Sequence, residues 1–567
     1  MKKNIKILLS LAALTPLMAV PAVAASCDNN TNKTTDTSKI NSTDKTEETN
    51  KEAKNNYMKY ETTKQFRDFL EATHGRKAGN IYNFQEDSLR KETVKAWLYD
   101  RETAKWGAKD QEAITGFNLE ANQALTSEIF KPRFSINSEA NKNVDIYGSW
   151  RAYEYLAKTI SDMGYTNHTG NVITYPDQNV RSETERKTEW NAAEHTHQDG
   201  AVTTFKNEDK YANLVTKMNE DITKDGFIVQ GFLYNNQAKS INNIGNNIIV
   251  TINPTEETLK ANENKTKQIK DFYIVSHYDS INNVGPTGIS WGATDNGSGV
   301  SVNLSLLKHF SDVKNRESLA VRLHIIFVDA EELGKYGSEA FVNQFLTPDR
   351  EGTDLLRNSV GMINMDTVAG GDRMYVHSAD SRETNANTST TIRDQINALS
   401  RIRSLNLNDP SQELEIHPQF TAGEYKPGET GDWSDHAPFY QKANLPIAYI
   451  ESTNFAVKAK TESYDGYAQT TNPKAWIKKS DHKPIESLVP RFLNNGLIEV
   501  YDWPEGLTRN DFEIAGDIWH SDLDRLDWVD ENLGAKFYNQ LDTVYQTLVA
   551  YLTSMYESND DGIEYFI

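Results

Sequence analysis

Cysteine is almost missing from this chain of 567 residues, in which Cys27 is the single one. One cysteine excludes a disulfide bond within the chain, so the fold has to rest on its apolar core. Long apolar runs are missing as well. Beyond the first 26 residues, no stretch approaches the roughly 18 uninterrupted apolar residues that a membrane-spanning helix needs. The sequence therefore predicts no transmembrane helix in this part of the chain.

Positive charge is also scarce. The chain has 60 Lys and Arg residues against 81 Asp and Glu residues, which gives a formal net charge of −21. No block rich in Lys or Arg stands out, whereas binding to nucleic acid rests mainly on neutralising phosphates with such residues. The composition therefore argues against nucleic acid as a partner. The 37% of apolar residues are enough for one large core or two smaller ones.

The first residues have the pattern of an export signal. Three lysines precede an apolar run over residues 7–23, which is followed by Ala24-Ala25-Ser26-Cys27. A lone cysteine at this place resembles a bacterial lipoprotein box, although Ala24 stands where Leu is usual. We expect residues 1–26 to be a signal peptide, and Cys27 to carry a lipid that anchors the protein to the extracellular face of the cell membrane. The alternative is cleavage after Ala24, which would give a secreted protein.

Three further parts can be separated by composition. Residues 27–56 consist almost wholly of Asn, Thr, Ser, Lys, Asp and Glu, and they predict a disordered tether. Over residues 57–131 apolar side chains recur at helical spacing, which we interpret as a helical N-terminal cap without chemistry. Residues 132–567 form the remaining domain, within which residues 166–242 are polar and predict irregular loops.

Short apolar runs alternate with helical patterns in this domain. We predict strands at residues 247–252, 272–276, 323–328, 360–365 and 446–450, and helices at residues 300–310, 337–345 and 533–556. Strands that alternate with helices indicate an α/β domain. The expected fold is a three-layer α/β/α sandwich with a mixed, mainly parallel central sheet. Residues 452–513 form an inserted segment rich in aromatic residues, which we expect to be a lid or a side wall.

Three of the apolar runs lead directly into a histidine or into acids. These residues are His277, the adjacent Glu331 and Glu332, and Asp366, and Asp295 follows the first of them in a Gly-rich loop. Parallel sheets carry their chemistry at the edge where the carboxyl ends of the strands meet. Imidazole and carboxylate ligands gathered at one edge form a ligand set that suits zinc. The sequence therefore predicts a zinc site at this edge.

The motifs also occur in a characteristic order. They are His277-Tyr278-Asp279, Thr294-Asp295-Asn296-Gly297, Glu331-Glu332, Asn364-Met365-Asp366 and the segment from His520 to Asp524. In these motifs the chain resembles the co-catalytic dizinc aminopeptidase family, peptidase family M28, which also contains glutamate carboxypeptidases and glutaminyl cyclases. The resemblance covers residues 143–556. It implies two zinc ions per chain and peptide or protein substrates.

The resemblance implies a role for each motif. His277 and Asp366 would bind one zinc ion, Glu332 and His520 would bind the other, and Asp295 would bridge both. Glu331 would be the general base, and a cis peptide bond is expected after Asp295. Asp279, two residues beyond His277, is expected to accept the second imidazole N–H and to fix its tautomer.

The second histidine ligand has competitors in the sequence. His436 and His482 each follow an aspartate directly and also fit a ligand motif. The resemblance favours His520, which lies in a His-x-x-x-Asp motif. Trp519 precedes it, where many peptidases of the family have Tyr and glutaminyl cyclases have Trp. Its indole N–H could donate a hydrogen bond that polarises a substrate carbonyl.

The motifs favour an aminopeptidase over three other functions. A glutaminyl cyclase, which uses one zinc ion, is the alternative that Trp519 favours. A surface lipoprotein that binds other molecules on a peptidase scaffold is another, but it would have no need of Glu331 beside Glu332. Carboxypeptidase action stays open, because the sequence does not place a cationic pocket for a substrate carboxylate.

Overall fold

The computed structural model describes residues 56–74, 145–169, 202–203, 218–236, 241–257, 269–280, 292–319, 321–332, 334–346, 355–383, 386–417, 426–458, 468–493, 498–554, 556–559 and 562–565. The predicted signal peptide, Cys27 and most of the predicted cap lie outside these residues. Among the helices that are described, none is long and apolar enough to cross a membrane.

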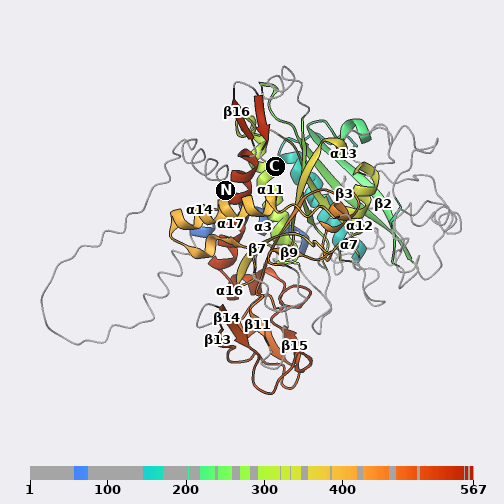
Figure 1. The fold of residues 1–567 in the computed structure, drawn as a ribbon. Helices are drawn as coiled ribbons and strands as arrows, with labels where there is room; N and C mark the ends of the chain where they lie inside the picture. The colour runs from blue at the N-terminus through green and yellow to red at the C-terminus, as the bar shows by residue number, and fades with distance from the viewer. Residues whose placement is uncertain are drawn as a thin grey trace, which may run out of the picture. The chain divides into compact units, whose positions relative to one another are not determined.

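A ten-stranded sheet runs through the molecule in the order β1-β2-β3-β5-β4-β6-β10-β7-β8, with β9 paired to β7 (Figure 1). The strands are β1 (Val202–Thr203), β2 (Gly226–Asn236), β3 (Ile241–Ile252), β4 (Asp271–His277), β5 (Arg322–Val328), β6 (Ser359–Met365), β7 (Arg373–Ala379), β8 (Leu414–Glu415), β9 (Glu429–Thr430) and β10 (Ile447–Thr453). The four central strands β5, β4, β6 and β10 are parallel, whereas β3 and β7 pair antiparallel to them on either side. The prediction of a mixed sheet with a parallel centre is confirmed.

Side chains of the central strands alternate between two apolar cores. On β4, Phe272 and Ile274 belong to one core, and Tyr273 and Val275 belong to the other. All four are fully buried. A strand that is buried on both faces reads as a continuous apolar run, which is why these strands could be predicted.

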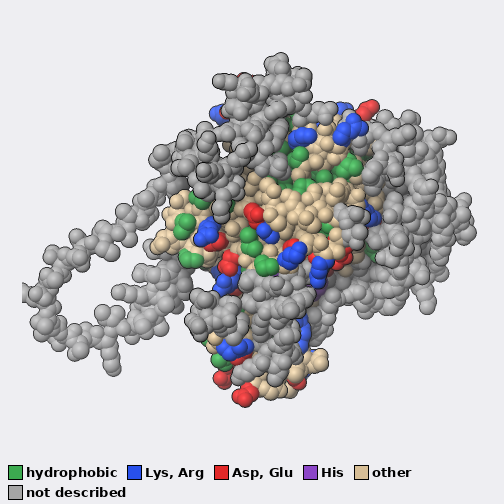
Figure 2. Space-filling view, in the orientation of Figure 1, with side chains coloured by type: hydrophobic (Ala, Val, Ile, Leu, Met, Phe, Trp, Pro, Cys, Tyr) green, Lys and Arg blue, Asp and Glu red, His purple; other side chains and the backbone are tan. Residues whose placement is uncertain are grey.

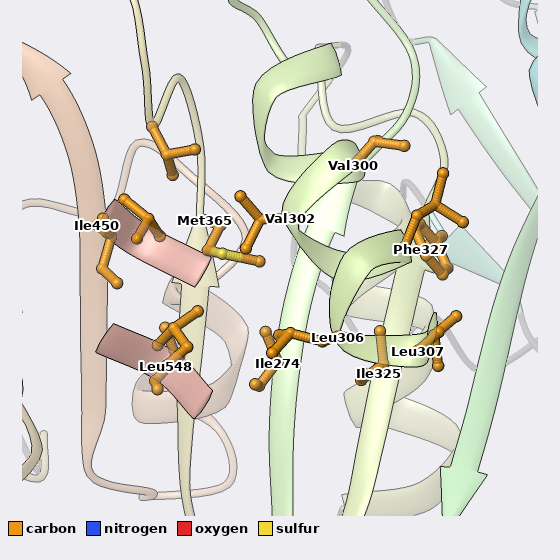
Figure 3. Close-up of a cluster of buried hydrophobic side chains, with 14 of the residues drawn as sticks. Ile274, Val300, Val302, Leu306, Leu307, Ile325, Phe327, Met365, Ile450 and Leu548 are labelled. Atoms are coloured by element: carbon orange, nitrogen blue, oxygen red, sulfur yellow. The ribbon is translucent and has the colours of Figure 1, made fainter. Parts of the chain in front are cut away.

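Helices cover both faces of the sheet, which makes three layers. On one face lie α3 (Glu61–His74), α7 (Asp145–Asp162), α11 (Gly297–Ser311), α14 (Thr391–Leu407) and α17 (Ala535–Thr553). Figure 3 shows this core, with Val302 and Leu306 of α11 beside Ile274 and Met365 of the sheet. On the other face lie α12 (Tyr336–Phe341), a π-helical turn (Val342–Leu346), α13 (Leu355–Asn358) and α15 (Ala437–Gln441).

The expectation of irregular loops over residues 166–242 is wrong for its C-terminal part. The strand β2 lies there and pairs antiparallel with β3 along its whole length. Its polar Gln230 is fully buried but donates to the Ala340 carbonyl at 3.0 Å and accepts from Asn247 at 2.8 Å. A polar residue with such partners is compatible with a buried strand, so polarity was a misleading signal.

The segment before the last motif has a small core of its own. It contains β11 (Val457–Lys458), β12 (Trp476–Lys478), β13 (Val489–Leu493), β14 (Ile498–Asp502) and β15 (Phe512–Ala515). These strands form a three-stranded sheet, β11-β14-β13, and a pair, β12-β15, which are grouped beside α16 (Leu526–Asn532) in Figure 1. Trp476 is fully buried between Trp503 and Phe512, with ring centroids 5.3 and 5.4 Å away.

Charged side chains of both signs are interspersed on the described part of the surface that Figure 2 shows. No broad area of one charge is visible on this part of that face.

Candidate metal centre

Three parallel strands end at nearly the same level. His277 is the last residue of β4 and lies beside Val328, the last residue of β5. Along the other side of β4, Val275 lies beside Asn364 of β6. Because β5 leads into Glu331 and Glu332 and β6 leads into Asp366, the ends of these strands bring the predicted ligands to one edge of the sheet.

Asp295 lies between two histidines and directs one oxygen toward each. Its Oδ1 is 3.2 Å from Nε2 of His277, and that nitrogen is also 3.2 Å from Oδ1 of Asp366. Its Oδ2 is 3.0 Å from Nε2 of His520, which is 2.8 Å from Oε2 of Glu332. The five residues therefore form two neighbouring groups that share one carboxylate. The peptide bond between Asp295 and Asn296 is cis, which confirms that expectation.

The spacing of these atoms fits metal ions. Donor atoms about 2.0–2.1 Å from a tetrahedral zinc ion lie about 3.3 Å from each other. Within the described chain, one ligand atom each from His277, Asp295 and Glu332 lie within 4.8 Å of one another. Oδ1 of Asp295 is buried, and its 3.2 Å contact with Nε2 of His277 has the length expected between two ligands of one cation.

The electrostatics of the centre also favour the binding of metal ions. Burial acts to lower the pKa of His277, but the charge of Asp366 and hydrogen bonds to neighbouring aspartates hold that pKa well above its usual value. The pKa of His520 is also held well above its usual value against burial, chiefly by Glu332. The acids thus attract positive charge to both imidazoles. Bound cations would supply that charge in place of the protons.

Glu331 is the acid of this group that makes none of these ligand-like contacts. Burial raises its pKa well above the usual value, and the charge of His277 offsets only part of this effect. It follows Ala330, whose φ of 58° lies in the left-handed region that non-glycine residues rarely adopt. The turn continues with the N–H groups of Gly334 and Lys335, which donate to the Glu331 carbonyl at 2.8 and 2.7 Å. Glu331 is therefore placed beside the ligands by a tight, strained turn.

Asp279 contacts both this turn and the imidazole of His277. Nδ1 of His277 lies 3.1 Å from the backbone carbonyl of Asp279 and 3.5 Å from its carboxylate. The carboxylate instead accepts the backbone N–H groups of Glu331 at 3.1 Å and Glu332 at 3.3 Å. The backbone carbonyl of Asp279 thus makes the closer contact with the imidazole. The carboxylate of Asp279 also holds the backbone at Glu331 and Glu332, which the sequence did not reveal.

Asp524 likewise fixes the backbone, here at Asp295. Its carboxylate accepts the backbone N–H of Thr294 at 2.5 Å and that of Asp295 at 3.2 Å. Burial, and then the charge of Asp295, raises the pKa of Asp524 to about 7. Its spacing in the His-x-x-x-Asp motif was the one sequence signal that could have identified it.

The other candidate histidines lie elsewhere. Nε2 of His436 donates to the Gly431 carbonyl at 2.6 Å, and burial lowers the pKa of His436 to about 3. The exposed His482 lies 2.5 Å from Glu513. Of the three candidate histidines, it is thus His520 that lies beside Glu332. Trp519 is partly exposed, and its backbone N–H donates to Gln469 at 3.1 Å.

The segment before His436 also contributes to the centre. Oγ of Ser434 donates to Oδ2 of Asp366 at 2.8 Å and accepts from Nδ2 of Asn364, also at 2.8 Å. Asp435 is fully buried, and burial raises its pKa to about 7. This motif therefore holds the side chain of Asp366, one of the predicted ligands, although His436 itself lies apart from it.

A three-layer α/β fold with imidazole and carboxylate groups gathered where its parallel strands end is typical of metal-dependent hydrolases. The model of peptidase family M28 matches residues 247–541, which include every residue of the centre. The chain belongs to peptidase family M28.

Individual relatives match over shorter parts. A glutamate carboxypeptidase 2 homolog of Caenorhabditis briggsae is 28% identical over 235 residues, which are 37% of this chain and 28% of the relative. A vacuolar membrane protease of Clavispora lusitaniae is 34% identical over 97 residues, which are 17% of this chain and 8% of the relative. The chain thus covers well under a third of the length of either relative.

Solved structures are similar at a low level. A zinc aminopeptidase from Bacillus subtilis has a TM-score of 0.30 and 19% identity, covering 54% of this chain and 50% of its own. A Zn-dependent exopeptidase from Parabacteroides distasonis has a TM-score of 0.34 and 13% identity, covering 70% of this chain and 96% of its own. Similarity at this level carries no information about the substrate.

Proposed function

We propose that this protein is an aminopeptidase that uses two zinc ions to hydrolyse the first peptide bond of peptides or proteins. The observation that carries the proposal is the division of the Asp295 carboxylate, with one oxygen beside His277 and the other beside His520. Two cations that lie close together need a shared anion to offset their repulsion. A site for a single cation would have no use for a second group of ligands.

Each residue of the centre has a role in this proposal. His277 and Asp366 hold one zinc ion, Glu332 and His520 hold the other, and Asp295 binds both. When bound, the ions supply a water of lowered pKa and a Lewis acid for the scissile carbonyl. Glu331 takes a proton from the attacking water and later delivers it to the leaving amine. The raised pKa of Glu331 suits both steps, because a base must hold the proton before it can return it.

The charge of the centre favours an aminopeptidase over a carboxypeptidase. The acids that gather here are Asp279, Asp295, Glu331, Glu332, Asp366, Asp435 and Asp524. The charges that chiefly shift their pKa values are those of the two histidines and of one another. Bound cations favour the ionised form of nearby acids, and seven ionised carboxylates would leave an excess of negative charge even beside two divalent cations. Such a site attracts the ammonium group of a free N-terminus and repels a C-terminal carboxylate.

A glutaminyl cyclase is the second candidate, and Trp519 before His520 is the observation that favours it. That activity uses a single zinc ion, whereas the divided Asp295 carboxylate favours two. The zinc content of the purified protein would separate the two proposals. A role in binding alone is disfavoured by Glu331, which would have no task.

We also propose that the enzyme works at the cell surface through a lipid on Cys27. The support is the position of the sole cysteine between the signal pattern and a polar tether. The relatives that are named vacuolar membrane proteases are in keeping with work at a membrane.

The test is a panel of aminoacyl p-nitroanilides beside the same compounds with an acetylated N-terminus. We expect cleavage of the free amines alone, loss of activity in chelator, and recovery when zinc is added. Release of C-terminal residues from N-acetylated peptides would favour a carboxypeptidase. Cyclisation of N-terminal glutamine by a protein with one zinc ion would favour the cyclase.

A further inference from the structure

The ligand His520 has no regular secondary structure to hold it. It lies in a turn between β15 and α16, whereas His277 ends a central strand. Its φ is 53°, in the left-handed region that costs energy for a residue with a side chain. About a third of its side chain, 32%, is exposed. The turn therefore needs support from elsewhere if Nε2 of His520 is to stay beside Glu332 and Asp295.

One buried side chain contacts this turn directly. Gln469 is fully buried, and its Oε1 accepts the backbone N–H groups of Ile518 at 3.0 Å and Trp519 at 3.1 Å. These are the two residues that precede His520. Because both groups are donors, they fix which end of the Gln469 amide carries the oxygen. Gln469 lies 51 positions before His520 in the sequence, within the inserted segment.

Gln469 is itself tied to two other parts of the structure. Its carbonyl accepts the N–H of Asp372 at 3.1 Å, in the loop that follows Asp366. The N–H of the next residue, Thr470, donates to the carbonyl of Gly516 at 3.0 Å. The position of Gln469 is therefore set by the loop after one metal ligand, and its side chain sets the turn that carries another.

The aromatic core of the inserted segment makes this arrangement rigid. Nε1 of the fully buried Trp476 donates to the carbonyl of Thr470 at 2.9 Å. Gly516 lies so close to Trp476 that a Cβ there would come within 2.6 Å of the indole ring, and its φ is 85°. Thr470, which follows Gln469, and Gly516, which precedes the turn with His520, thus both contact the indole of Trp476.

The nitrogen of the Gln469 amide differs from its oxygen. Nε2 is buried and has no hydrogen-bond partner among the described residues. A buried donor without a partner lowers the stability of a fold.

We infer that the inserted segment is the scaffold of the His520 metal ligand and that Gln469 is a positioning residue, whose carbonyl oxygen sets the turn that carries His520. This inference rests on the proposed two-zinc centre. It replaces a lid as the main role of the segment with a structural task inside the centre. Loss of the oxygen should loosen one metal position and leave the other intact.

The test uses two variants of the whole protein that lose the same kind of contact. Gln469→Met keeps the length of the side chain but leaves two backbone N–H groups without an acceptor. Gln540→Met is the matched control, because the buried Gln540 also bonds two backbone groups, accepting from Gly370 at 3.0 Å and donating to Gly371 at 2.9 Å. For each protein the two zinc dissociation constants are measured by competition with a chromophoric chelator, and the melting temperature is measured without metal.

We expect Gln469→Met to weaken one zinc position by about 10–100-fold, as loss of a supporting residue around a metal site does. The second position should keep its dissociation constant. Gln540→Met should lower the melting temperature. It should not change the zinc dissociation constant of the position that Gln469→Met weakens. In a protein with His520→Ala, adding Gln469→Met should cause no further loss of zinc, because the position that Gln469 supports is already gone.

The outcomes separate this inference from the proposed function. An unchanged protein that binds fewer than two zinc ions would refute both. Two tight zinc positions in Gln469→Met would refute the inference alone. Equal weakening in Gln469→Met and Gln540→Met would also refute it, because general loss of stability would then explain the effect.

Discussion

Replacing Glu331 by glutamine tests the chemistry of the centre with little change in its shape. Glutamine keeps the length of the side chain and removes its basicity. The backbone N–H of Glu331 still donates to Asp279, at 3.1 Å, and the neighbouring Glu332 keeps its contact with His520, at 2.8 Å. The change therefore removes a proton acceptor and leaves the ligand set in place.

The size of the effect follows from the role. General acid–base catalysis contributes about 10²–10⁴-fold, so turnover should fall by at least about 100-fold. The sign of the stability effect can also be worked out. Burial raises the folded-state pKa of Glu331, so the stability that this acid contributes is present at low pH and is lost as the pH rises through the raised pKa. Glutamine does not ionise, so the metal-free variant should be at least as stable as the parent at neutral pH.

The assay compares Glu331→Gln with Glu332→Gln in turnover, zinc content and melting temperature. Glu331→Gln should keep two zinc ions and lose turnover, whereas Glu332→Gln should lose zinc from one position. Near-normal turnover in Glu331→Gln would show that it is not the base. Loss of zinc from Glu331→Gln as readily as from Glu332→Gln would show that the two roles are misassigned.

Three further predictions concern other parts of the chain. His520→Ala should reduce the zinc content from two ions to about one, and His436→Ala should leave two; the reverse result would move the ligand to His436. Burial raises the pKa of Glu451 to about 8, so its stabilising effect is lost as the pH rises from about 5 to 8, by at most about 1.4 kcal/mol per pH unit. Glu451→Gln should flatten the free energy of unfolding over this range, whereas a variant curve parallel to that of the parent would contradict the assignment. Cys27→Ala should move the protein from the detergent phase to the aqueous phase, and unchanged partitioning would count against a lipid anchor.

The strands that could be predicted are those that are buried on both faces. The run predicted at residues 323–328 became β5, Arg322–Val328, and the run at residues 360–365 became β6, Ser359–Met365. In contrast, β7 was missed although it lies inside the sheet. Its buried His377 is a polar residue that lies 2.8 Å from Glu451 of β10, and that partner is far away in the sequence. Apolar runs identify strands only where the buried side chains are apolar.

The same limit applies to the centre. The gathering of His277, Glu332 and Asp366 at one edge of the sheet could be predicted, because the convergence of parallel strands depends only on local patterns. The sequence singled out Asp279 and Asp524, but the backbone contacts that both make could not be predicted. Gln469 acts on the turn with Trp519, and Asp524 acts on Asp295, across contacts that link residues 50 and 229 positions apart. No pattern in a single sequence reports such pairs.

Two buried carboxylates explain how a cluster of acids keeps its shape. Asp279 accepts two successive backbone N–H groups at the turn with Glu331, and Asp524 accepts two at the loop with Asp295. In both cases an acid outside the proposed ligand set fixes the backbone of a proposed ligand or of the proposed base. This arrangement places negative charge behind the ligands and prevents them from turning away from each other. The fold thus holds the acids together before any cation binds, and the repulsion that remains among them becomes part of the driving force for binding metal.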